Sequence, residues 1–222
     1  MATEDNVREI EERVARACER AGRSPADVTV VAVSKTVGAA AIEAAFDAGL
    51  RHFGESRVQE ARPKIEQLAR LRPDVNWHMV GHVQTNKART AVDIFDIIQS
   101  VDSVRLAEAL DRYSSKKLPV FVEVNIAGEA TKSGFEPGQV ERALSDIAAL
   151  PNLVVEGLMT VAPWVSDAEE VRPVFRQLRE MRDALGLRHL SMGMTDDFEV
   201  AIEEGATLVR IGRAVFGERE RF

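Results

Sequence analysis

The chain has 222 residues, of which 45% are hydrophobic and 29% charged, with a formal net charge of −7 and one cysteine. The hydrophobic share is too high for a disordered chain, no apolar run approaches the ~18 residues of a membrane span, and a lone cysteine excludes an internal disulfide. Net acidity with only 5% aromatic residues argues against nucleic-acid binding, so we expect a cytoplasmic globular protein with no membrane or nucleic-acid partner.

The first predicted element is a helix over about residues 4–22. Val7, Ile10, Val14 and Cys18 recur at helical spacing on one face, and Gly22 is placed to end the helix. We therefore interpret Cys18 as a small core residue rather than as a nucleophile, since free cysteine is usually buried.

Short β-branched segments follow, separated by amphipathic helical patterns, and the pair recurs about every 25 residues. The first segment is almost wholly apolar, as in a strand that is buried on both faces. The predicted strands are Val28–Ser34, His52–Gly54, Trp77–Gly81, Phe95–Ser100, Val120–Asn125, Val154–Thr160, His189–Met192 and Leu208–Gly212. Alternation of strands and helices predicts a parallel sheet, because parallel strands require crossover connections.

Eight such units in about 220 residues fit a (β/α)₈ barrel. A doubly wound open sheet is the alternative, but it would favour a GxGxxG turn after the first strand, which residues 33–38 lack. No Ser-, Gly- or Pro-rich linker divides the chain. We predict an α/β fold with one domain over residues 1–222: a single TIM barrel over about residues 28–217, with an additional N-terminal helix.

In such barrels the functional residues lie at the C-terminal ends of the strands. Lys35 directly follows the first strand. Burial of a lysine in a low-dielectric wall leaves more free amine, which carbonyl attack and Schiff-base formation require. The alternative interpretation is a solvated lysine that closes the strand.

The last two strands end in patterns that fit an anion, as loops after the seventh and eighth strands of TIM barrels often do. Two hydroxyls and a glycine precede a helical stretch in the segment Ser191–Thr195, and the eighth strand ends in Arg210-Ile211-Gly212-Arg213. The alternatives are a capping box formed by Asp196 and Glu199 and rim arginines that are merely salt-bridged. Together with a lysine at the first strand, the pattern predicts a phosphorylated aldehyde or ketone held as an imine.

The four histidines do not form a metal-binding pattern. Only His78 and His82 are close in sequence, they flank a predicted strand end, and no HExxH motif is present. We expect no metal site.

Seven segments, in order along nearly the whole chain, resemble the YggS/PROSC family of pyridoxal 5′-phosphate homeostasis proteins. They are residues 31–36, 53–60, 77–87, 124–134, 157–160, 190–197 and 209–217. The resemblance implies a barrel like the N-terminal domain of alanine racemase, with pyridoxal 5′-phosphate (PLP) as cofactor, bound covalently as a Schiff base on Lys35.

The resemblance also implies the cofactor-binding residues. They are Lys35, Ser56, Ser191, Met192, Gly193, Thr195, Arg210, Gly212 and Arg213, of which Arg210 faces the pyridine nitrogen. An arginine there would disfavour a protonated ring nitrogen and so weaken the cofactor as an electron sink. The sequence departs from the family pattern at Ser56, His82 and Arg213, where asparagine, proline and threonine are frequent.

The function implied is PLP homeostasis: the protein holds PLP and delivers it to apo PLP-dependent enzymes, without catalytic residues or dedicated turnover. The alternative is a PLP-dependent amino-acid racemase. A racemase of this type needs an opposing tyrosine from a C-terminal β-domain, whereas the sequence ends soon after the eighth strand and Tyr113 lies in a predicted helix. A lysine-dependent aldolase would need a second buried lysine or acid beside Lys35. We expect a monomer, with a dimer as the alternative.

Overall fold

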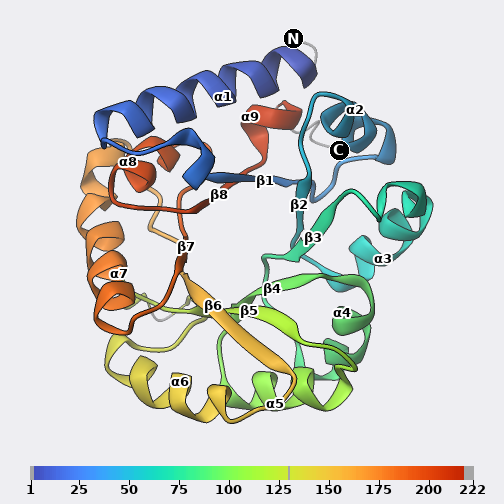
Figure 1. Ribbon diagram of the computed structural model, residues 1–222, viewed down its shortest axis with the longest axis vertical. Helices are drawn as coiled ribbons and strands as arrows, with labels where there is room; N and C mark the ends of the chain where they lie inside the picture. The colour runs from blue at the N-terminus through green and yellow to red at the C-terminus, as the bar shows by residue number, and fades with distance from the viewer. Residues whose placement is uncertain (1–2, 130, 218–222) are drawn as a thin grey trace.

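A computed structural model of the protein describes residues 3–129 and 131–217, so both ends of the predicted domain lie outside the described residues. Eight parallel strands form a closed barrel in chain order, and helices surround it as an outer ring (Figure 1). The strands are β1 (Thr29–Val33), β2 (His52–Glu55), β3 (Asn76–Met79), β4 (Ile97–Val101), β5 (Leu118–Glu123), β6 (Leu153–Met159), β7 (His189–Ser191) and β8 (Leu208–Ile211). The predicted (β/α)₈ barrel is confirmed, and each strand overlaps the segment predicted for it.

Helices cover the outside of the barrel, one of them before β1 and the others after the strands. They are α1 (Thr3–Arg20), α2 (Ala39–Asp47), α3 (Val58–Gln67), α4 (Ala88–Ile94), α5 (Val104–Tyr113), α6 (Val140–Ala148), α7 (Arg172–Ala184), α8 (Phe198–Glu203) and α9 (Arg213–Phe216). Short 3₁₀ turns lie at Pro25–Asp27, Ala69–Leu71, Thr85–Lys87, Pro137–Gln139 and Ala168–Val171. None of the helices in the described part of the chain is long and apolar enough to cross a membrane.

The additional N-terminal helix is present and ends slightly earlier than predicted. Gly22 adopts a left-handed conformation with φ 63°, which lets the Arg23 N–H donate to the carbonyl of Cys18 and closes the helix. The helix packs against α2, α8 and α9 (Figure 1). The Asn6 side chain donates to the Val215 carbonyl at 3.0 Å, which ties the helix to the segment after β8.

The core has two parts. The larger part lies between the barrel and the helices and contains Phe53, Trp77 and Cys18, all fully buried. Burial raises the pKa of the Cys18 thiol, in agreement with its interpretation as a core residue. A smaller apolar cluster that includes Val31 and Met159 lies inside the barrel. His52 of β2 and Arg210 of β8 are paired with Val31 in the sheet and therefore face the same interior.

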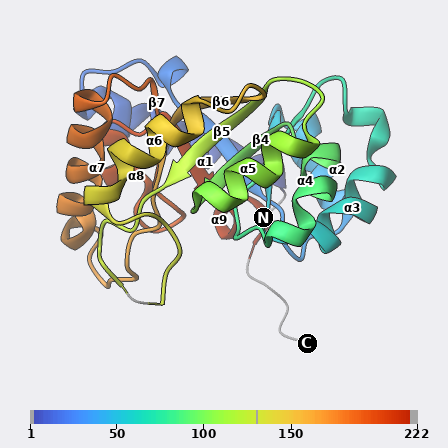
Figure 2. The same cartoon turned by 90° about the horizontal axis from the view of Figure 1, so that it is seen from below.

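All eight strands point toward the same end of the barrel, which we call the mouth. The loops that follow β5 and β6 project from this end (Figure 2). The C-terminal ends of β1, β7 and β8, where the sequence places its candidate residues, therefore lie side by side at the mouth.

The contact between β6 and β7 depends on Gly157. A Cβ atom at this position would lie 2.0 Å from the His189 carbonyl oxygen, so an alanine cannot enter without displacing a strand. We expect Gly157→Ala to lower the free energy of unfolding by about 3 kcal/mol in urea denaturation. Gly138→Ala is the control because its Cβ would meet open space. Equal stability of the two variants would contradict this packing.

Candidate functional site

Lys35 lies at the mouth, just beyond the end of β1 and beside the turn that follows β8. β1 and β8 pair in parallel, and a Cβ atom on Gly212 would lie 3.2 Å from the Val33 carbonyl oxygen. The turn after β7 reaches the same place because the Arg210 N–H donates to the Gly193 carbonyl at 2.9 Å. The structure thus brings the lysine and both predicted anion-binding turns to neighbouring strand ends.

A buried ion pair fixes the backbone that carries Lys35. The Glu55 carboxylate is 0% exposed and accepts from Lys64 Nζ at 2.5 Å and from Ser34 Oγ at 2.7 Å. Lys64 Nζ also donates to the Ser34 carbonyl at 2.7 Å. On the other side of Lys35, Thr36 adopts a left-handed conformation with φ 65°, which β-branched residues rarely adopt. Lys35 therefore sits between an anchored residue and a strained one, a pattern found at functional sites.

The turn after β7 is shaped by Gly193 and Asp197. Gly193 has φ 90°, and a Cβ atom there would lie 2.6 Å from a side-chain carbon of α8, so glycine is required. The Asp197 carboxylate accepts from the Met194 N–H at 2.5 Å, and burial raises its pKa. The backbone N–H groups of Thr195 and Asp196 have no hydrogen-bond acceptor within the described ranges. The turn therefore presents backbone donors suited to an anion.

The alternative interpretation of this segment, a capping box formed by Asp196 and Glu199, is wrong. The N-cap residue of α8 is Asp197, which makes no side-chain capping bond, and Glu199 instead pairs with Arg13 of α1 at 3.2 Å. Asp196 forms an ion pair with Arg213 at 2.6 Å. Glu199 and Asp196 thus pair with arginines far away in the sequence and not with each other's backbone, and the Asp196 charge is balanced by Arg213.

The ion pair with Asp196 holds the Arg213 side chain, which is half-exposed, at the rim of the mouth. The backbone N–H groups of Arg213 and Ala214, next to Gly212, have no acceptor among the residues that the structure describes. The donors that this turn offers are therefore backbone N–H groups, with a guanidinium at the rim.

Arg210 lies inside the barrel, 5% exposed, and burial lowers its pKa to about 10. Its Nη1 donates to Ser191 Oγ at 2.6 Å and its Nη2 to the Thr160 carbonyl at 2.8 Å. Because a guanidinium carries five N–H donors, groups remain that make no hydrogen bond to the described residues. The remaining N–H groups of this buried cation can donate to an anion or to a ring nitrogen that lies at the mouth.

Beyond Ser191, the hydrogen bonds continue through the barrel interior to residues that sequence reasoning missed. Ser191 Oγ donates to Gln99 at 2.6 Å, Gln99 contacts His78 at 2.8 Å, and His78 contacts His52 at 2.9 Å. Burial, followed by the neighbouring His52, lowers the pKa of His78 to about 3, so this histidine is neutral. The available signal was the presence of His78 and Gln99 inside otherwise apolar strands, where a polar side chain requires a partner.

Two further predicted residues lie at the edge of this arrangement. The Met192 side chain is fully buried in the core outside the barrel, so it is the backbone of Met192 that runs past the mouth. Ser56 follows β2, where its carbonyl lies 2.3 Å from the position of a Cβ on Gly81. The contacts of both residues with a cofactor stay predictions.

A cavity of about 200 Å³ opens at the mouth, between the ends of β3, β5 and β6. Glu123 and Lys132 line it together with His82, whose Nδ1 lies 2.6 Å from the Asp102 carboxylate. Glu123 is 8% exposed, and burial, followed by the Asp102 charge, raises its pKa to about 7. The mouth therefore contains a carboxyl group that titrates near neutral pH.

This carboxyl group makes the stability of the protein depend on pH. The pKa of Glu123 is about 7 in the folded state, against an ordinary value of 4.5, so the folded protein holds this proton more tightly than the unfolded chain. Its contribution to stability is complete below the ordinary pKa and declines as the pH rises toward about 7. We expect wild type to lose about 3 kcal/mol relative to Glu123→Gln across this window, measured by urea denaturation. Parallel stability profiles for the two proteins would contradict this assignment.

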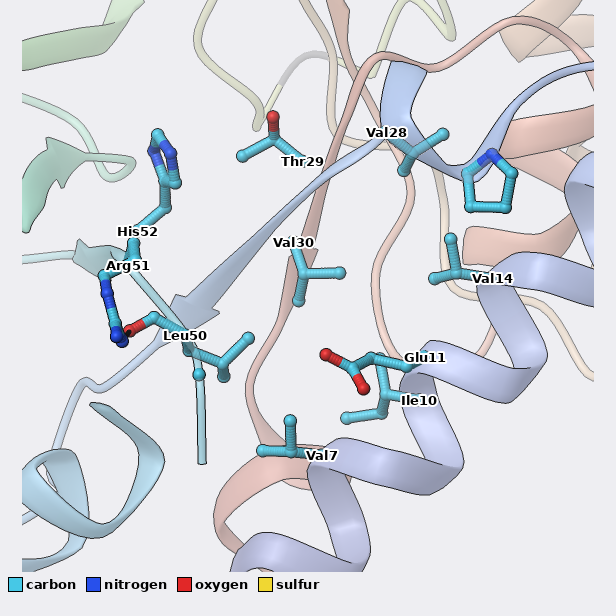
Figure 3. Close-up of a pocket in the computed structure, with 12 residues that line it drawn as sticks. Val7, Ile10, Glu11, Val14, Val28, Thr29, Val30, Leu50, Arg51 and His52 are labelled. Carbon is cyan, nitrogen blue, oxygen red and sulfur yellow. Dashed lines mark hydrogen bonds between the residues drawn. The ribbon is translucent and has the colours of Figure 1, made fainter. Parts of the chain in front are cut away.

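A larger cavity, of about 440 Å³, lies elsewhere, between α1 and the N-terminal ends of β1 and β2 (Figure 3). Val7, Val14 and Val30 form an apolar wall there, with Glu11 beside it. None of the predicted cofactor-binding residues lines this cavity. Residues 3–129 and 131–217 contain no group of three or more His, Cys, Asp or Glu side chains placed to hold a metal ion.

The fold and the site define a TIM-barrel protein whose mouth combines a lysine, a buried arginine and two glycine-shaped turns with free backbone donors. Residues 6–220 match the family model described as the N-terminal domain of alanine racemase. A pyridoxal phosphate homeostasis protein from Aquifex aeolicus is 45% identical over 218 residues, covering 94% of this chain and 95% of that protein. The chain belongs to the family of pyridoxal phosphate homeostasis proteins, on the fold of the alanine racemase N-terminal domain.

Solved structures agree with this placement. A protein from Bifidobacterium adolescentis described as unknown has a TM-score of 0.91 and 38% identity, covering 96% of this chain and 94% of its own. PipY of Synechococcus elongatus, solved with PLP bound, has a TM-score of 0.80 and 40% identity, covering 94% of this chain and 100% of its own. The sequence resemblance to this family is confirmed.

Proposed function

We propose that this protein binds PLP, with Lys35 as the residue of covalent attachment, and holds it for exchange rather than for dedicated turnover. The observation that carries the proposal is the convergence of Lys35 with the turns after β7 and β8 at neighbouring strand ends. PLP supplies an aldehyde that bonds reversibly to a primary amine. The names of the relatives and the PLP bound to PipY support the choice of ligand.

The donors at the mouth fit a phosphate group. Backbone N–H groups without acceptors among the described residues lie in both turns, at Thr195 and Asp196 and at Arg213 and Ala214. Gly193 keeps the first turn close to α8, and Gly212 leaves the backbone of the second turn open. We assign these two turns to the phosphate, with Thr195 as a hydroxyl donor and the Arg213 side chain as a rim cation.

Arg210 is the residue that we assign to the pyridine nitrogen. Ser191 Oγ accepts from Arg210, so its role in the proposal is to orient this cation from inside the barrel. A cation beside the ring nitrogen disfavours a proton there and weakens electron withdrawal, which suits holding PLP rather than reacting it. Ser56 and the backbone of Met192 complete the border of the site.

A racemase would need a proton-transfer group on the face opposite Lys35. Tyr113 does not provide one, because it ends the outer helix α5, at the far end of the barrel from the mouth, with the Arg89 guanidinium 5.3 Å from its ring. Delivery of PLP to apo-enzymes in the cytoplasm stays a prediction. Racemase activity is tested by incubating the protein with L-alanine and then separating the alanine enantiomers. Turnover of about 1 s⁻¹ or more would overturn the non-catalytic proposal.

Titration of the apo-protein with PLP, followed by absorbance, tests the assignment of the two turns. 5′-Deoxypyridoxal is the matched ligand because it lacks the phosphate and, unlike pyridoxal, has no free 5′-hydroxyl that could close onto the aldehyde. We expect it to bind at least about tenfold more weakly, since the charge-assisted hydrogen bonds of the turns are lost. Equal affinity for the two ligands would show that the turns do not bind the phosphate.

A further inference from the structure

The hydrogen-bonded side chains inside the barrel form one continuous chain from Arg210 through Ser191, Gln99 and His78 to His52. The successive distances are 2.6, 2.6, 2.8 and 2.9 Å. Ser191, Gln99 and His78 are fully buried, and they come from β7, β4 and β3, so the chain crosses the barrel between strands that are not neighbours. TIM-barrel interiors are usually filled by branched apolar side chains, so a buried polar chain calls for an explanation.

The hydrogen bonds between these side chains run in one direction, from donor to acceptor, starting at Arg210, because a guanidinium donates hydrogen bonds and cannot accept them. Arg210 donates to Ser191 Oγ, and the single Ser191 hydroxyl hydrogen is therefore donated onward to Gln99 Oε1. The Gln99 Nε2 group then faces His78 Nδ1 as a donor. Neutral His78 carries its one proton on Nε2, where it is donated to His52 Nδ1.

We propose that Gln99 and His78 are positioning residues for Arg210: Gln99 accepts a hydrogen bond from the Ser191 hydroxyl and is itself held by His78, so that Ser191 is a fixed acceptor that keeps the guanidinium aimed at the mouth. Without Gln99, the Ser191 hydroxyl can rotate and Arg210 loses its directed acceptor. Two carboxyl groups then compete for the cation, since Glu123 of β5 and Asp197 of the turn after β7 both attract Arg210 electrostatically. The consequence for the cofactor rests on the proposed function, in which Arg210 meets the pyridine nitrogen.

Three variants separate positioning from mere packing. Gln99→Met keeps the length of the side chain and removes both its donor and its acceptor. Gln99→Glu keeps an acceptor for Ser191 and, with its buried carboxyl group protonated, a donor for His78 Nδ1. Leu208→Met is the control, because Leu208 belongs to the apolar cluster inside the barrel and takes no part in the chain.

We expect Gln99→Met to weaken PLP binding about tenfold and to shift the absorption maximum of bound PLP. Gln99→Glu is expected to stay within about threefold of wild type with an unshifted spectrum, as is Leu208→Met. An unchanged affinity and spectrum in Gln99→Met, or losses of equal size in Leu208→Met, would overturn the positioning role.

A second measurement needs no PLP and so separates this proposal from the proposed function. Nitrogen-15 NMR of the imidazole rings is expected to show His78 neutral at neutral pH, with its proton on Nε2, and hydrogen exchange of the Arg210 side chain to be about tenfold faster in Gln99→Met than in wild type. A proton on Nδ1 of His78, or equal exchange in the two proteins, would overturn the proposal whatever the protein does with PLP. If wild type fails to bind PLP while these signals are as expected, only the proposed function fails. The wild-type spectrum alone keeps the proposal falsifiable if Gln99→Met does not fold.

Discussion

Replacement of Lys35 by methionine is expected to abolish covalent attachment of PLP and to weaken its binding by about a hundredfold or more. Methionine keeps the reach of the side chain but has no amine, so binding would rest on the phosphate turns and Arg210 alone. Lys35→Arg is expected to behave in the same way, because a guanidinium keeps the charge but is not a nucleophile at neutral pH. Equilibrium dialysis with PLP measures the loss.

The matched control is Lys116→Met, an exposed lysine in the segment that leads into β5, at the end of the barrel away from the mouth. This variant is expected to bind PLP as wild type does. Wild-type affinity in Lys35→Met, or an equal loss in both variants, would remove Lys35 from the site.

Replacement of Lys64 by methionine is expected to lower the free energy of unfolding by about 3–5 kcal/mol. The Glu55 carboxylate is fully buried, and its Oε2 atom has no hydrogen-bond partner in the described part of the chain. Without Lys64, this charge would keep only the Ser34 hydroxyl as a donor. The Ser34 carbonyl would also lose its hydrogen bond from Lys64, so we expect weaker PLP binding at the adjacent Lys35.

Arg62→Met is a control on the same helix, because Arg62 pairs with Glu66 on the exposed surface at 3.0 Å and such pairs contribute about 0–1 kcal/mol. The double variant Glu55→Gln, Lys64→Met is expected to be more stable than Lys64→Met alone, since it leaves no unpaired charge. Urea denaturation measures all of these differences. A Lys64→Met variant within about 1 kcal/mol of wild type would show that the pair does not hold the β1 end in place.

Much of the fold could be predicted because strands and helices alternate with clear periods. The apolar run that ends before Lys35 placed this lysine at a strand end, and the barrel topology then placed the turns after β7 and β8 beside it. Closure of the barrel makes β1 a neighbour of β8, a contact between the two ends of the sequence that follows from the fold class alone.

The contacts that hold the site could not be predicted in the same way, because they join residues far apart in sequence. Glu55 accepts a hydrogen bond from Ser34 at the end of the neighbouring strand, and Ser191 donates to Gln99 across the barrel interior. The alternative of a capping box at Asp196 and Glu199 is wrong for the same reason, because Glu199 pairs with Arg13 of α1 and not with the helix end beside it. Periodicity shows which residues are buried, whereas the pairing of buried polar groups depends on strand register.

The covalent role of Lys35 is tested most directly by reduction of the wild-type protein with borohydride in the presence of PLP, followed by peptide mass mapping. Reduction makes the bond between the aldehyde and the lysine permanent, so the modified residue can be identified. We predict a PLP adduct on the peptide that contains Lys35 and none on the peptides that contain Lys64, Lys87 or Lys132. An unmodified Lys35 in a protein that carries the adduct on another lysine would contradict the proposed function.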